Sequence, residues 1–138
     1  MPKYVETWRS VAYPWNCDSL GHMNTQFYAA AYDGASVHFR MRIAPPGELF
    51  KRRISFADVR QLIEYKHEVL AGTPLVVRST LTRLGNKSVE FLHEMRNAES
   101  DDLHSTCAMT SVLFDLQARK AILIEDWMRE RAKVLADG

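Results

Sequence analysis

Residues 11–39 read VAYPWNCDSLGHMNTQFYAAAYDGASVHF, and within this segment a strand gives way to a helix. The strand pattern breaks at residues 16–19, the chain turns through Gly21, and a helical pattern begins after Asn24. Asp18 therefore lies just before a helix N-terminus, where unpaired backbone N–H groups carry a partial positive charge. A carboxylate beside such a helix end supplies the minimal set of groups for acyl transfer.

The helix is predicted over residues 25–41, with the Asn24 side chain as its N-cap. Several side chains recur at three- and four-residue spacing and predict one buried face: Phe27, Tyr28, Ala31, Ala35, His38 and Phe39. Many residues between them are small, so the helix can lie close to a sheet. Residues 44–47, Ala-Pro-Pro-Gly, are predicted to end it.

Strand patterns surround this helix. One strand is predicted at residues 7–13, and four more at residues 60–70, 75–84, 87–96 and 103–116, the last extended by residues 121–124 after a bend. Because no helix separates these four, they should pair antiparallel as hairpins. Strands this long twist and coil, so the sheet can wrap one central helix. A second helix is predicted at residues 125–136, which gives an α+β fold.

The run from Asp18 to Tyr28 also carries a family resemblance. It fits the pattern D-x-x-G-H-x-N-x-x-(Y/F) and resembles the hotdog-fold acyl-CoA thioesterases of the 4-hydroxybenzoyl-CoA thioesterase-like group. The resemblance implies one hotdog domain over residues 1–138, a long curved antiparallel sheet around a central helix. Many members carry an acidic residue two positions before the catalytic Asp, and this chain has Asn16 there.

The resemblance implies an acyl-CoA thioesterase in which Asp18 is the nucleophile or general base and the Thr25 backbone N–H stabilises the oxyanion. Gly21 and His22 belong to the same catalytic loop. The alternative is that Asp18 caps a turn, that Gly21 gives the turn its backbone freedom, and that His22 is structural. The predicted substrate-binding residues are Asn24, Tyr28, Lys87 and Ser88, of which Asn24 is also explained as a helix cap alone.

Cys17 allows a rival mechanism in which it is the nucleophile and His22 is the base. Neighbouring residues of an extended segment point in opposite directions, so Cys17 and Asp18 should not both face the substrate. The family pattern favours Asp18. The five histidines have no metal-ligand spacing, so no metal is predicted.

Composition narrows the class of protein further. The chain has 138 residues, 46% of them hydrophobic and 25% charged, and a formal net charge of +1. This suits a single packed domain and argues against a nucleic-acid partner. We find no apolar run long enough to span a membrane, no signal peptide and no metal or redox cysteine spacing. We therefore expect a cytoplasmic enzyme without a cofactor, coenzyme A being part of the substrate.

A lone hotdog unit leaves a sheet edge unpaired, which invites a partner strand. The family resemblance implies self-association as a homodimer or homotetramer. Two other functions fit the pattern less well. A hotdog hydratase or dehydratase usually has a His five residues after its Asp, whereas His22 follows Asp18 by four. A non-catalytic acyl-CoA-binding module would normally carry a further domain.

Overall fold

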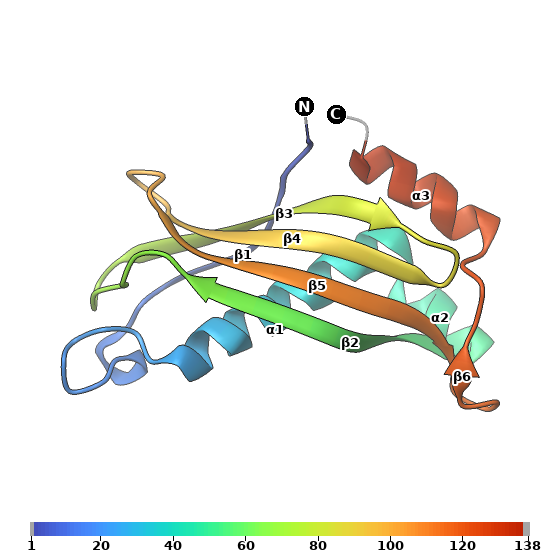
Figure 1. The fold of residues 1–138 in the computed structure, drawn as a ribbon, viewed down its shortest axis with the longest axis horizontal. Helices are drawn as coiled ribbons and strands as arrows, with labels where there is room; N and C mark the ends of the chain where they lie inside the picture. Colours follow the sequence, from blue (N-terminus) through green and yellow to red (C-terminus); the bar gives the residue numbers. More distant parts are fainter. Residues whose placement is uncertain (1, 137–138) are drawn as a thin grey trace.

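The computed structural model describes residues 2–136, which form a six-stranded antiparallel sheet curved around one long helix (Figure 1). The strands are β1 (Val5–Val11), β2 (Ile54–Tyr65), β3 (Pro74–Leu84), β4 (Ser88–Asn97), β5 (Leu103–Asp115) and β6 (Lys120–Ala121). The helices are α1 (Thr25–Ile43), α2 (Pro46–Arg52) and α3 (Asp126–Ala136). The order β1-β3-β4-β5-β2, with β6 paired to β5, confirms the predicted hotdog fold.

Helix α1 begins where its sequence predicts. The Asn24 side chain accepts a hydrogen bond from the Gln26 N–H (3.1 Å) and is the N-cap. The buried side chains are Tyr28, Ala31, Tyr32, Ala35, Ser36, Phe39 and Ile43. Phe27 and His38, expected in this face, are only half-buried because they lie at its margins. The helix comes close to β1, since a Cβ on Gly34 would lie 3.4 Å from Trp8 Cδ1.

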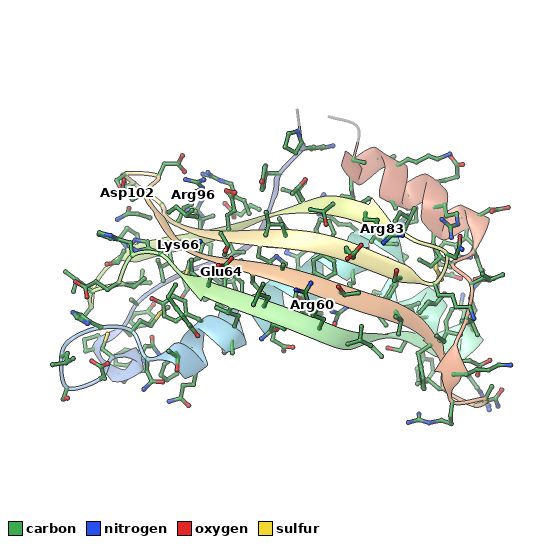
Figure 2. All side chains as sticks on the ribbon, viewed as in Figure 1. Arg60, Glu64, Lys66, Arg83, Arg96 and Asp102 are labelled. Atoms are coloured by element: carbon green, nitrogen blue, oxygen red, sulfur yellow. The ribbon has the colours of Figure 1, made fainter. Side chains whose placement is uncertain are left out.

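The central strands alternate as predicted. β4 buries Val89, Phe91, His93 and Met95 against α1 and turns its intervening residues outward. β5 repeats this pattern with Cys107, Met109 and Leu113 among others. The opposite face of the sheet carries charged side chains, among them Arg60, Glu64, Arg83 and Arg96 (Figure 2). The core therefore lies between the sheet and α1.

The predicted strand at residues 60–70 is wrong at both ends, because β2 starts at Ile54 and stops at Tyr65. The backbone N–H groups of Lys66 and His67 both donate to the His104 carbonyl, at 2.9 and 3.0 Å. This shared acceptor ends the regular pairing of β2 with β5, so His67 is an exposed residue beyond the strand.

Residues 66–70, which were included in the predicted strand, form a segment that contacts the loop before α1. Val69 is fully buried, and its carbonyl accepts a hydrogen bond from the Met23 N–H (2.8 Å). The segment between β2 and β3 thus packs against the loop before α1. Val69 is therefore buried by the loop that covers the helix start and not by a strand pairing.

Two further predictions need correction. β1 begins and ends two residues before the predicted strand at residues 7–13, because Pro14–Asn16 forms a short 3-10 helix. Residues 121–124 do not prolong β5. The chain reverses after Asp115, whose side chain accepts the Gln117 and Ala118 N–H groups, and β6 pairs back onto β5.

Two short helices complete the fold. The proline-rich residues 44–47 end α1, but Pro46 also starts α2, since proline suits the first helical position. Helix α3 lies beside the turn between β3 and β4, and its Arg129 donates to the carbonyls of Gly85 (2.9 Å) and Asn86 (3.0 Å). No helix within residues 2–136 has the length and apolar character required to cross a membrane.

A chain of buried polar side chains crosses the interface between α1 and the sheet. His93 on β4 is fully buried, and its ring nitrogens contact the hydroxyls of Ser36 on α1 (2.8 Å) and Ser79 on β3. The Ser79 hydroxyl also bonds the Thr7 hydroxyl (2.7 Å) on β1. Every member has a partner, as buried polar groups require.

Candidate active site

The loop before α1 holds Asp18 in a defined position. Asp18 Oδ1 accepts hydrogen bonds from the backbone N–H groups of Leu20 (2.9 Å) and His22 (3.3 Å). Gly21 has a φ of 80°, a conformation that other residues rarely adopt. Within residues 2–136, Asp18 Oδ2 has no hydrogen-bond partner, and the side chain is exposed. One oxygen thus maintains the loop while the other is available to a ligand.

The first turn of α1 leaves one donor unused. The Asn24 side chain takes the Gln26 N–H, and the Phe27 N–H donates to the Asn24 carbonyl (3.0 Å). The Thr25 N–H has no acceptor within the described residues. This is the donor expected for an oxyanion, at the positive end of a helix.

The His22 ring forms no hydrogen bond with Asp18 within the described residues. Its Nε2 lies 3.2 Å from a carboxylate oxygen of Glu68, and its backbone forms an isolated bridge with Leu70. The sequence does not indicate this role for Glu68, because Glu68 falls within the predicted strand at residues 60–70. The pair links the Asp18 loop to the segment that follows β2.

Tyr28 occupies the same side of the helix start. Its ring meets that of Tyr65, the last residue of β2, edge to face with centroids 4.9 Å apart. Burial raises the pKa of the Tyr28 hydroxyl, which therefore stays protonated at neutral pH. The end of β2 thus forms one wall beside the helix start.

Lys87 and Ser88 lie elsewhere. They follow the turn between β3 and β4, which Figure 1 places near β6 and α3, at the opposite end of the sheet from the start of α1. Lys87 lines an open cavity of about 570 Å³ together with Arg52 and Lys120. Within residues 2–136, neither lysine has a carboxylate within 4.0 Å, whereas Arg52 pairs with Glu125. The cavity is therefore basic.

The geometry does not favour the rival nucleophile. The Cys17 thiol contacts the Tyr13 carbonyl (3.5 Å), and no hydrogen bond joins it to His22 within the described residues. Among the same residues, no group of three or more His, Cys, Asp or Glu side chains is arranged to hold a metal ion.

Comparison of the sequence with known families identifies its relatives. Residues 13–132 match the model of the thioesterase-like superfamily. The chain belongs to that superfamily. Membership supports thioester hydrolysis as its activity, and the matched region includes the Asp18 loop, the start of α1 and the basic cavity. No curated protein sequence matches the chain.

Solved structures agree with the fold of this superfamily member. A hypothetical protein from Staphylococcus aureus, SAV2348, determined in complex with CoA, has a TM-score of 0.86 at 12% identity, over 98% of this chain and 84% of that one. YbaW, a probable thioesterase from Escherichia coli, has 0.77 at 19%, over 99% of both chains. A 1,4-dihydroxy-2-naphthoyl-CoA thioesterase from Synechocystis has 0.76 at 17%, over 98% of both.

Proposed function

We propose that the chain is an acyl-CoA thioesterase, with Asp18 as nucleophile or general base and the Thr25 N–H as oxyanion donor. The observation that supports it most strongly is that two groups near one helix start, a carboxylate oxygen and a backbone N–H, have no hydrogen-bond partner among the described residues. Asp18 Oδ2 and the Thr25 N–H both lack partners within residues 2–136. Unsatisfied groups of opposite character at one site are suited to a substrate carbonyl.

The chemistry requires little else. A thiolate leaves without a strong general acid, so one carboxylate and one preorganised donor suffice. Asp18 either attacks the carbonyl carbon to form an anhydride that water hydrolyses, or removes a proton from the attacking water. In both routes the carbonyl oxygen becomes an anion, and the Thr25 N–H stabilises it.

Product analysis tests this proposal against the other hotdog reactions. Hydrolysis yields free CoA and a carboxylic acid, whereas hydration or dehydration leaves the thioester intact and changes the acyl mass by one water. We expect free thiol and acid in equal amounts. An acyl-CoA of altered mass, or saturable binding with no product, would assign the chain to a hydratase or to a binding module.

We further propose that two copies pair through β2. This strand is an edge of the sheet and exposes Val59 and Leu62, so its free backbone groups and apolar side chains suit a second copy. A two-fold axis through the middle of β2 would pair the strands antiparallel. It would bring the basic cavity, which Ile54 lines, toward the partner's Tyr65 end of β2 and hence toward its Asp18.

Sedimentation equilibrium tests the pairing. We expect a dimer or a multiple of it for the wild type, and dissociation when Leu62 is changed to Lys, because the apolar contact is lost and each strand of the interface then carries an inserted charge. Lys66→Glu, outside β2, should not dissociate it. A wild-type chain that sediments as a monomer at micromolar concentration would contradict this assembly.

The basic cavity provides a further prediction. If Lys87, Arg52 and Lys120 hold the phosphates of CoA, Lys87→Ala should raise the KM for acyl-CoA about tenfold with little change in kcat. The matched control is a truncated acyl-pantetheine thioester, which lacks those phosphates. Its KM should be the same for both proteins, and an equal rise for both substrates would place the effect of Lys87 elsewhere.

A further inference from the structure

A second cavity lies on the flank of α1 that faces β1. It has a volume of about 250 Å³ and lies between β1 and the first turns of the helix. Its walls are Trp8, Ser10, Val11, Tyr13, Trp15, Asn16, Met23, Phe27, Ala30 and Ala31. No charged side chain lines it, so its chemistry is distinct from that of the basic cavity and from that of the Asp18 loop.

The space exists because α1 presents two alanines, Ala30 and Ala31, to the cavity. Phe27, Ala30, Ala31 and Gly34 recur at three- and four-residue spacing and so form one flank of α1. Trp8 packs over Gly34 and closes one end of the cavity. Between Phe27 and Trp8, only the methyl groups of the two alanines project from the helix, and they leave room for a small apolar group.

The mouth of the cavity is aromatic and open. Tyr13 and Trp15 stack with centroids 4.6 Å apart and planes within 4° of parallel. Trp15 is 72% exposed, although a ring of this size is usually covered by other groups. The Tyr13 N–H donates to Asn16 Oδ1 (3.0 Å), a contact that orders the backbone between the two rings. An exposed aromatic pair beside a cavity favours an apolar ligand.

The cavity is continuous with the helix start. Met23 and Phe27, which line it, stand two residues before and two residues after Thr25. The Asn16 carbonyl accepts the N–H of the helix cap Asn24 (2.8 Å), so a single hydrogen bond ties the wall to the cap. The cavity therefore lies beside the first turn of α1, the turn that carries the unpaired Thr25 N–H.

We propose that this cavity holds the acyl group of the thioester, and that the enzyme acts on acyl groups of one aromatic ring or a short unbranched chain. This rests on the proposed function. The volume lies below the range of pockets for drug-sized ligands, so it suits a small acyl group rather than a long chain. The absence of a charged wall disfavours dicarboxylic acyl groups.

Ligand binding tests the cavity without any turnover. Of the three tryptophans, Trp8 and Trp15 line it, so a Trp127→Phe protein reports on it by fluorescence. Titration with phenylacetate or hexanoate, the free acid products, should give a saturable change. Ala30→Leu, which fills the cavity from an exposed helical position, should weaken binding about tenfold. Ala136→Leu, the same change on α3, should not.

The wild-type background then gives the activity test. We expect the ratio of kcat/KM for phenylacetyl-CoA to that for acetyl-CoA to fall about tenfold in Ala30→Leu and to be unchanged in Ala136→Leu. If Ala30→Leu does not fold, as judged by circular dichroism, Trp15→Ala replaces it and should lower the same ratio by removing the mouth.

The outcomes separate the two proposals. No saturable fluorescence change, a change that a folded Ala30→Leu protein retains in full, or an equal loss for both acyl-CoAs would overturn the acyl assignment. If neither acyl-CoA releases thiol but both acids bind in an Ala30-dependent manner, the thioesterase function fails. The cavity would then stand as a site for small apolar carboxylic acids.

Discussion

Replacing Asp18 with Asn is expected to lower kcat for acyl-CoA hydrolysis by about 10³-fold or more, while the fold stays intact. The loop explains why this substitution should remove the carboxylate without disturbing the fold. Asp18 Oδ1 accepts the Leu20 and His22 N–H groups, and the amide oxygen of Asn can accept both. Only the negative charge and the basicity of the second oxygen are lost. Steady-state thiol release, with circular dichroism as the check on folding, measures the effect.

Two companion variants strengthen the interpretation. Asp18→Ala removes the loop caps as well as the charge and should be inactive and slightly less stable. Glu68→Gln weakens the contact to His22 Nε2 without touching Asp18, so it should retain most activity. Undiminished turnover in Asp18→Asn would show that Asp18 only caps its turn.

The largest effect on stability is expected at His93. Changing it to Leu leaves the buried Ser36 hydroxyl without its partner, at a cost of about 1–3 kcal/mol in the free energy of unfolding, whereas Ser79 keeps its contact with Thr7. Urea denaturation measures this cost. Adding Ser36→Ala to the Leu variant removes the orphaned hydroxyl and should recover part of the loss. A His93→Leu protein as stable as the wild type would show that the network contributes nothing.

The same residue predicts a pH dependence. Burial, with a smaller effect of the Arg40 guanidinium, lowers the pKa of His93 from 6.5 to about 3. The unfolded chain therefore binds a proton as the pH falls below 6.5, whereas the folded chain does not. The stability from this group is complete above that pH and declines toward pH 3, by roughly 1 kcal/mol per pH unit.

His93→Gln is the matched control for this decline, because its amide keeps a donor and an acceptor but does not titrate. Acidic groups elsewhere change both proteins alike, so the difference in unfolding free energy between them isolates His93. The free energy of unfolding of the wild type, relative to that of His93→Gln, should fall as the pH is lowered from about 7 to about 4. A constant difference over this range would contradict a buried neutral imidazole.

Much of the fold could be predicted because local patterns coincide with packing. The alternation in β4 and β5 matches their buried faces, and the Asn24 cap marks the start of α1. The prediction failed at residues 66–70, where a strand pattern continues beyond the end of β2. Val69 is buried by the loop before α1 rather than by a strand, and that contact joins segments distant in sequence. No local pattern reports such a contact.

The candidate active site was likewise predictable only where its residues are close in sequence. The motif from Asp18 to Tyr28 predicted the loop and the helix start, because all of its residues are close in sequence. The partner of His22 was not predictable, since Glu68 reaches it only through the fold. Nor was the cavity on the β1 flank, whose walls come from a strand, a loop and a helix. Lys87 and Ser88 follow the turn between β3 and β4, which lies at the other end of the sheet (Figure 1).

The most direct test of the central claim is the initial rate of thiol release from a panel of acyl-CoAs graded in length, with aryl and short charged acyl groups included. We expect saturable release by the wild-type chain, fastest with a single-ring or short-chain acyl group. Binding of acyl-CoA without thiol release from any member of the panel would contradict it.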